Sequence, residues 1–203
     1  MDLGYFRKLF GDEPRCELEF AGDLECLVAI ILSAQCTDKR VNAVTRELFK
    51  KYRNIADFAN CDVRELERDI FSTGFYKNKA KSIVQMARAV MRDYGGVVPR
   101  DFESLIKLDG VGRKTAGVFL VERGAGGGDF FPVDTHVMRV AGRLGLSHGR
   151  NVREIERDLC REFAPNERGR AHLYLVLFGR YYCTARSPKC LGCGLRAGCL
   201  YGK

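Results

Sequence analysis

The sequence predicts an all-α protein, and three observations lead to this fold class. Apolar residues three or four positions apart recur along most of the 203 residues, as on the buried face of a helix. Runs of alternating β-branched residues, which would indicate strands, are missing over any useful length. Glycine is concentrated in one stretch, residues 124–129, with the composition of a linker or exposed loop. The length suits one generous domain or two small ones.

Six helices are expected in the first half of the chain. The second is mostly apolar and therefore buried, while the third places Val41 and Leu48 on a single face. Asp23 is expected to cap the second helix and Thr37 or Asp38 the third, and the pair Gly95-Gly96 closes the sixth. The expected ranges are 1–10, 23–35, 38–52, 54–59, 63–71 and 78–94.

Five more helices are expected in the second half. Asp134 begins one of them and Asn151 caps the next, because both side chains accept hydrogen bonds from the N–H groups of a first helical turn. An apolar, extended segment precedes Asp134. The expected ranges are 102–108, 113–123, 134–144, 152–163 and 170–182.

The formal net charge is +8 and the sequence pI is about 9.1, which favours a polyanion as partner. Nucleic acid is the first candidate and an anionic membrane surface the second. Residues 166–203 contain seven Lys or Arg against one acid, so this basic tail carries +6 of the charge. The alternative is a basic surface that is only solvated.

Cysteine usage and hydropathy indicate a reducing compartment. Five of the nine cysteines are scattered without pattern, which fits free thiols better than a disulfide scaffold. No segment resembles a signal peptide, and the apolar run at 24–32 is too short to span a bilayer. We therefore expect a soluble, cytoplasmic, monomeric protein without a membrane partner, associated with the nucleoid if the source is prokaryotic.

The segment Gly110-Val111-Gly112-Arg113-Lys114-Thr115 predicts a tight turn between two helices. The N–H groups of such a turn, and of the helix that follows, are donors for an anion. Lys114 lies in the first turn of that helix, where it is a candidate nucleophile. A nucleotide-binding P-loop needs Gly immediately before Lys, where this chain has Arg113. An ordinary helical turn with an exposed lysine stays open as the alternative.

Val133-Asp134-Thr135-His136 offers a carboxylate that could act with Lys114. Asp134 could accept a proton or stabilise positive charge on a sugar, and it could equally serve only as a helix cap. His136 is better explained as a hydrogen-bonding residue at a helix start than as a base.

The strongest single pattern is Cys183-x6-Cys190-x2-Cys193-x5-Cys199. Four clustered thiolates can hold an iron–sulfur cluster or a zinc ion, and disulfides are a third possibility. The wide first gap is unusual for zinc, so the spacing favours iron–sulfur. The loop between the first two cysteines presents Arg186 and Lys189, which suit phosphate contacts.

Three patterns therefore coincide: Leu108-x-Gly110-Val111-Gly112-Arg113-Lys114-Thr115-Ala116, Val133-Asp134-Thr135-His136 and the four-cysteine tail. Together they resemble the endonuclease III family of bifunctional DNA glycosylases, in the helix-hairpin-helix superfamily. Leu32-Ser33-Ala34-Gln35-x-Thr37-Asp38 and Gly179-Arg180-Tyr181-x-Cys183 are similar to further segments of the family. The resemblance covers nearly the whole chain, in the family's order.

The resemblance implies two helical domains that flank a DNA-binding cleft. Residues 17–127 would form a six-helix barrel with the helix-hairpin-helix motif. Residues 1–16 and 128–203 would form a discontinuous domain that carries a [4Fe–4S] cluster on Cys183, Cys190, Cys193 and Cys199.

The resemblance also implies base-excision repair of duplex DNA that contains damaged bases or abasic sites. Oxidised pyrimidines would be removed and the strand nicked by β-elimination through a lysine Schiff base. Lys114 matches the family's nucleophile and Asp134 its essential carboxylate. Gln35 matches a residue that fills the gap left by the extruded base, and Phe75 lies where a wedge leucine is usual. The other expected DNA contacts are Gly110, Val111, Gly112, Arg113, His136, Arg186 and Lys189.

Two alternatives remain at this point. One is a monofunctional adenine or mismatch glycosylase of the same superfamily, which uses water and generally lacks a lysine at the position of Lys114. The other is a non-catalytic DNA-binding or electron-transfer module, against which the pair Lys114 and Asp134 argues. One departure from the family is Asp109, which stands where Pro is common.

Overall fold

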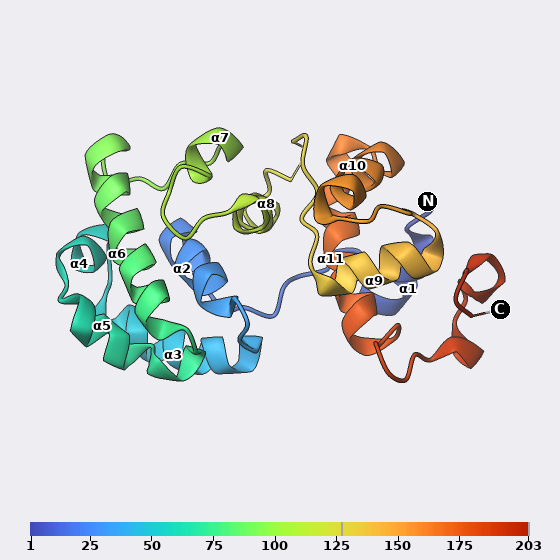
Figure 1. The fold of residues 1–203 in the computed structure, drawn as a ribbon, viewed down its shortest axis with the longest axis horizontal. Helices are drawn as coiled ribbons and strands as arrows, with labels where there is room; N and C mark the ends of the chain where they lie inside the picture. Colours follow the sequence, from blue (N-terminus) through green and yellow to red (C-terminus); the bar gives the residue numbers. More distant parts are fainter. Residues whose placement is uncertain (127, 203) are drawn as a thin grey trace. The chain divides into compact units, whose positions relative to one another are not determined.

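The computed structural model describes residues 1–126 and 128–202, which form helices and connecting segments without a strand (Figure 1). The all-α prediction is therefore confirmed. The chain divides into two compact units: a terminal unit, Met1–Cys16 with Gly124–Lys203, and a central unit, Glu17–Arg123. Gly127, the last residue of the expected barrel domain, and Lys203, in the basic tail, lie outside the described residues.

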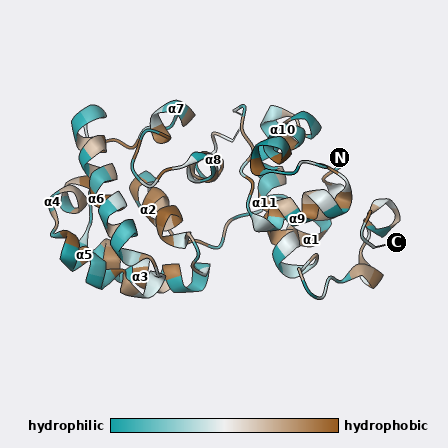
Figure 2. Ribbon diagram, in the orientation of Figure 1, coloured by the Kyte–Doolittle hydropathy of each residue, from teal (hydrophilic) through white to brown (hydrophobic). Residues whose placement is uncertain are grey.

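The central unit is built around α2 (Asp23–Ser33), whose residues 26–32 are all buried. This helix is apolar on every side, so it has to be enclosed by others. It packs against α3, α6 and α8 (Figure 1), and Figure 2 shows how hydrophobic it is beside the mixed surface of α6. The other elements are α3 (Asp38–Lys51), α4 (Ile55–Asn60), α5 (Val63–Asp69), η1 (Phe71–Thr73), α6 (Tyr76–Asp93), α7 (Phe102–Leu105) and α8 (Arg113–Glu122).

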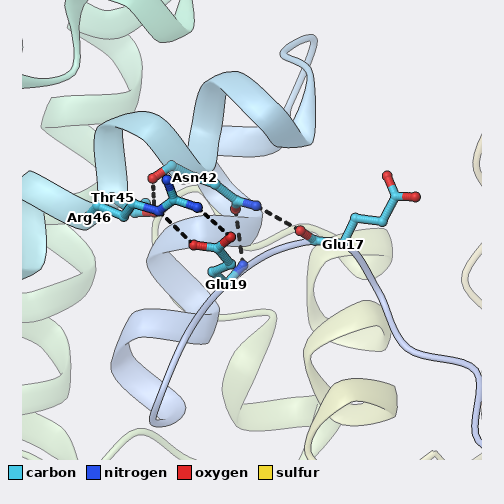
Figure 3. Close-up of polar contacts among 5 residues, drawn as sticks. All are labelled: Glu17, Glu19, Asn42, Thr45 and Arg46. Atoms are coloured by element: carbon cyan, nitrogen blue, oxygen red, sulfur yellow. Dashed lines mark hydrogen bonds and ion pairs between the residues drawn. The ribbon is translucent and has the colours of Figure 1, made fainter.

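The segment that leads into the central unit is fastened to α3 by side chains (Figure 3). The Asn42 amide donates to the Glu17 carbonyl at 2.8 Å and accepts from the Glu19 N–H at 3.0 Å. Arg46 binds the Glu19 carboxylate through two nitrogens, at 2.7 and 2.8 Å, and this guanidinium holds the pKa of Glu19 below its ordinary value. An extended segment without a helix of its own is thereby held in place.

The N-caps of α2 and α3 can be compared with those expected from the sequence. The Thr37 side chain accepts from the Arg40 N–H and caps α3, as predicted. Asp23 does not act as a cap, since the N-cap of α2 is Gly22. Its carboxylate instead pairs with Arg100 at 2.7 Å and Arg123 at 2.6 Å, and Arg100 contributes most to lowering the pKa of Asp23.

The terminal unit combines α1 (Gly4–Phe10) with α9 (Thr135–Leu144), α10 (Val152–Glu162), α11 (Pro165–Tyr181), η2 (Cys190–Gly192) and η3 (Arg196–Gly198). Its core is aromatic: the ring of Phe6 stacks on Tyr174 with centroids 5.9 Å apart and meets Phe178 edge-on at 5.3 Å. Burial of such rings is the main favourable term for a unit this small. No helix in the described part of the chain is both long and apolar enough to cross a membrane.

The helix expected at 170–182 begins five residues earlier than predicted, with Pro165 in its first turn. Arg168 lies inside this extension and is buried, so it does not belong to a free basic tail. Its guanidinium donates to the carbonyls of Gly128 and Cys160, both at 2.7 Å, and to that of Phe163 at 3.2 Å. A cation that binds three carbonyls ties segments of the core together rather than offering charge to a partner.

Candidate functional site

The predicted turn between two helices is present in the central unit. Asp101 caps α7 by accepting from the Ser104 N–H, and α8 begins directly after Gly112. Because a glycine is the N-cap, no side chain occupies the amino end of α8, where the N–H groups of a first turn lack partners within the helix. The Arg113 guanidinium lies 4.9 Å from the centroid of the Phe102 ring and joins the two helices of this hairpin.

The two glycines of the turn differ in what they allow. Gly110 has φ +74°, a left-handed conformation, and a Cβ there would lie 2.7 Å from the Cβ of Ser82 on α6. Gly112 has φ −79° and open space around its Cα. Gly110 is therefore required for the close approach of the turn to α6, whereas Gly112 leaves the outer surface of the turn uncovered.

Lys114 and Val111 differ in their exposure to solvent. Lys114 is exposed in the first turn of α8. The side chain of Val111 is buried, and its N–H donates to the Leu108 carbonyl at 3.1 Å. Val111 therefore anchors the turn, and the exposed donors belong to the residues that follow it.

Gln35 and Phe75 lie in two loops of the central unit and share an unusual backbone conformation. They are the two non-glycine residues with positive φ in the described part of the chain, at 54° and 48°. Phe75 is the N-cap of α6 and its side chain is 63% exposed. Left-handed backbone at such residues costs about 1–3 kcal/mol and tends to occur at functional sites. The backbone therefore marks the same two residues that the sequence predicts to enter DNA.

Asp134 is the N-cap of α9 in the terminal unit. Its carboxylate accepts from the Val137 N–H at 2.8 Å, so the capping role is present. The following turn packs tightly on α11, because a Cβ on Gly179 would lie 2.8 Å from the Cβ of His136. The His136 Nδ1 lies 3.2 Å from the Arg139 guanidinium, which only donates, so Nδ1 accepts and the ring proton of neutral His136 lies on Nε2.

The four clustered cysteines line one cavity in the terminal unit, which opens to solvent and has about 380 Å³ of space between its atoms. Its wall is completed by apolar side chains, with Lys189 and Arg196 at its edge. A Cβ on Gly202 would lie 3.9 Å from the sulfurs of both Cys190 and Cys199. No three His, Cys, Asp or Glu side chains within 1–126 and 128–202 are grouped around a point that would hold a single metal ion.

Two arginines of α9 form hydrogen bonds with the cysteine loop, and neither was predicted from the sequence. Arg143 donates to the Cys183 sulfur at 3.4 Å and to the Thr184 carbonyl at 2.8 Å, and it lies 3.9 Å from the centroid of the Tyr201 ring. Arg139 donates to the carbonyls of Cys183 at 3.0 Å and Gly179 at 2.7 Å. Their spacing of four residues on one helix face was the available signal.

The remaining predicted contacts are distributed over the surface. Arg186 is exposed in the loop that follows Cys183. Lys189 is also exposed, and its ammonium lies 4.9 Å from the centroid of the Tyr182 ring. Both therefore lie where an anion could reach them.

The chain is similar to known proteins in both sequence and structure. Residues 28–165 match the model of the HhH-GPD superfamily base excision DNA repair proteins. Endonuclease III of Bacillus subtilis is 46% identical over 189 residues, which cover 93% of this chain and 85% of that protein. Endonuclease III of Escherichia coli K12 is 37% identical over 188 residues, covering 93% and 88%.

Solved structures agree with this relationship. A trapped covalent intermediate of endonuclease III with DNA, an estranged-adenine complex, superposes with a TM-score of 0.91 at 43% identity, covering 98% of this chain and 93% of that one. A thermostable thymine-DNA glycosylase superposes with a TM-score of 0.82 at 25% identity, covering 98% and 94%.

The fold and the hairpin thus define a helix-hairpin-helix protein of base excision DNA repair. Within this class the chain belongs to the endonuclease III family. It is a DNA glycosylase and AP lyase. The alternative of a non-catalytic DNA-binding or electron-transfer module is therefore excluded.

The geometry of the hairpin turn gives a first prediction. Gly110→Ala should lower the free energy of unfolding by about 1–3 kcal/mol, because the added methyl is overpacked against Ser82 at a left-handed φ. Gly112→Ala is the matched control and should change it by less than about 0.5 kcal/mol. Urea unfolding measures both, and equal stability of the two variants would contradict the close approach to α6.

Proposed function

We propose that this chain removes oxidised pyrimidines from duplex DNA and nicks the strand through a Schiff base on Lys114. The observation that carries the proposal is an exposed lysine in the first turn of a helix that starts at a glycine turn. A related protein, 43% identical, has been trapped as a covalent intermediate with DNA. A covalent intermediate requires a nucleophile from the protein, because attack by water would leave no bond between protein and DNA.

The hairpin would bind the DNA backbone. The amino end of α8 combines helix N–H groups with the positive end of the helix dipole, and a phosphate suits both. Gly110 lets the turn pack against α6, Gly112 lets the phosphate approach the backbone, Val111 anchors the turn, and Arg113 adds a cation. Arg186, Lys189 and the Nε2–H of His136 would contribute further phosphate contacts.

Gln35 and Phe75 would hold the duplex open while the damaged nucleotide is turned out. Extrusion costs a few kcal/mol of stacking and pairing, which inserted side chains offset. Phe75 is apolar and exposed, as a wedge has to be, and Gln35 has the donors and acceptors to face an unpaired base.

The chemistry then follows from the two catalytic side chains. The uncharged amine of Lys114 attacks C1′ of the sugar, and the bond from C1′ to the base breaks with the electron pair leaving on the base. The nitrogen then loses a proton, and its lone pair forms the C1′=N bond of the iminium while the C1′–O4′ bond breaks. The ring oxygen O4′ takes up a proton and becomes a hydroxyl. Removal of a proton from C2′ then expels the 3′ phosphate by β-elimination. The Asp134 carboxylate would stabilise the positive charge on the sugar and accept protons.

We further propose that Cys183, Cys190, Cys193 and Cys199 hold a [4Fe–4S] cluster. Four thiols around one cavity with apolar walls fit a multi-atom cluster, which is larger than a single ion. Arg143 would donate to one ligand sulfur, and such hydrogen bonds stabilise thiolate charge. The cluster would supply structure, because it fixes a loop too small to own a core and so holds Arg186 and Lys189 in place.

Lys114→Gln should abolish the adduct that borohydride traps with a thymine-glycol duplex, because an amide cannot form an iminium. DNA affinity should change less than about three-fold, since binding rests on the hairpin and the other cations. Lys50→Gln, an exposed lysine on α3, is the control and should trap normally. Nicking that survives in Lys114→Gln would show that another residue is the nucleophile.

Asp134→Asn separates capping from catalysis. Asparagine caps a helix as well as aspartate does, so the free energy of unfolding should change by less than about 0.5 kcal/mol. Single-turnover excision should fall about 100-fold or more, because the carboxylate charge and its proton acceptor are gone. Asp62→Asn, at the cap of α5, is the matched control and should leave excision unchanged. Unimpaired excision by Asp134→Asn would leave Asp134 as a cap only.

The cluster is tested by its iron and its colour. The purified protein should be brown and contain about four iron atoms per chain, and Cys190→Ser should lose both. Cys61→Ser, a thiol of the central unit that donates to the Phe58 carbonyl, should keep them. One zinc ion per chain and no colour would establish the alternative metal.

A further inference from the structure

Lys79 is a lysine of α6 whose side chain lies inside the central unit. It is 6% exposed, and its ammonium donates to the carbonyls of Leu32 at 2.8 Å and Thr73 at 2.9 Å. Burial lowers its pKa, which expresses the cost of holding a cation away from water. Burying an ammonium costs more free energy than burying an apolar side chain of the same size, so the position of Lys79 indicates a role other than packing.

The two carbonyls belong to α2 and η1, which end just before the loops that carry the side chains expected to enter DNA. Leu32 is three residues before Gln35, and Thr73 is two residues before Phe75. The backbone N–H of Lys79 also donates to the Phe75 carbonyl at 3.1 Å. One residue therefore bonds to Thr73, to Phe75 and to the end of α2.

Each loop contains a residue whose backbone conformation has to be held in place. Gln35 and Phe75 adopt the left-handed backbone that side chains disfavour, and such strain persists only where the surroundings fix it. Leu32 is in the last turn of α2. The backbone carbonyls of a last turn lack N–H partners within the helix and form the negative end of the helix dipole. A cation at this place satisfies the carbonyl, matches the dipole and links the loop to α6.

We propose that Lys79 is a positioning residue for base extrusion, whose ammonium clamps the Gln35 loop to the Phe75 loop so that both side chains enter the duplex at a fixed separation. This inference rests on the proposed function of Gln35 and Phe75. Lys79 does not touch the DNA. Insertion of two side chains from two loops is productive only if they arrive in register, and small misplacements of such groups cost large factors in rate.

Lys79→Met keeps the length of the side chain and removes its donors. With a thymine-glycol duplex, single-turnover excision should fall by about 10- to 100-fold. With the same duplex carrying a preformed abasic site, nicking should fall less than about three-fold, because no base has to be extruded and Lys114 is intact. Tyr52→Phe loses a hydrogen bond to Asp69 elsewhere in the unit and is the control for lost stability: its ratio of excision to nicking should not change.

A second comparison isolates the clamp. In a Gln35→Ala/Phe75→Ala background, Lys79→Met should cause no further loss of excision, because nothing remains to be positioned. Equal losses on the two substrates, or the same loss in both backgrounds, would overturn the inference and leave the proposed function intact. Unchanged excision in Gln35→Ala/Phe75→Ala itself would overturn both. Should Lys79→Met fail to fold, Lys79→Gln, whose shorter amide cannot reach both carbonyls, takes its place.

Discussion

The close approach of Gly110 to Ser82 is the contact on which the central unit's site depends. It brings the hairpin turn against α6, and the same helix carries Phe75 at its N-cap and Lys79 one turn later. Through Lys79 it also reaches the end of α2 and the Gln35 loop. One helix is therefore the common reference for the turn that would bind phosphate and for both side chains that would enter the duplex. The position of the turn on this helix depends on the absence of a side chain at Gly110.

In the terminal unit α9 has a comparable role. Asp134 is its N-cap, and Arg139 and Arg143 on the same helix bind the backbone and sulfur of the cysteine loop. Gly179 allows α11 to pack against the first turn of this helix. The carboxylate and the loop that would carry the cluster are thus fixed to one rigid element, so the proposed cluster would have a structural role.

Local signals in the sequence predicted local structure well. Thr37 and Asn151 cap the helices they precede, and the hairpin glycines lie at the expected turn. The failures concern side chains whose partners are far along the chain. Asp23 looks like a cap but pairs with Arg100 and Arg123 instead, because two guanidiniums compete successfully for its carboxylate. Periodicity carries no information about such pairings.

Cations that bind the protein's own backbone explain why charge predicted the partner better than it predicted the interface. The net charge favours a polyanion, yet Arg168, Arg139 and Arg143 direct much of their hydrogen bonding to carbonyls of their own chain. Lys79 does the same. Several donors on one long side chain can join segments that no helix or sheet would connect, and hydrogen bonds to carbonyls offset the cost of removing the cation from water. Some of the charge that composition alone would assign to DNA binding therefore holds segments of the protein itself together.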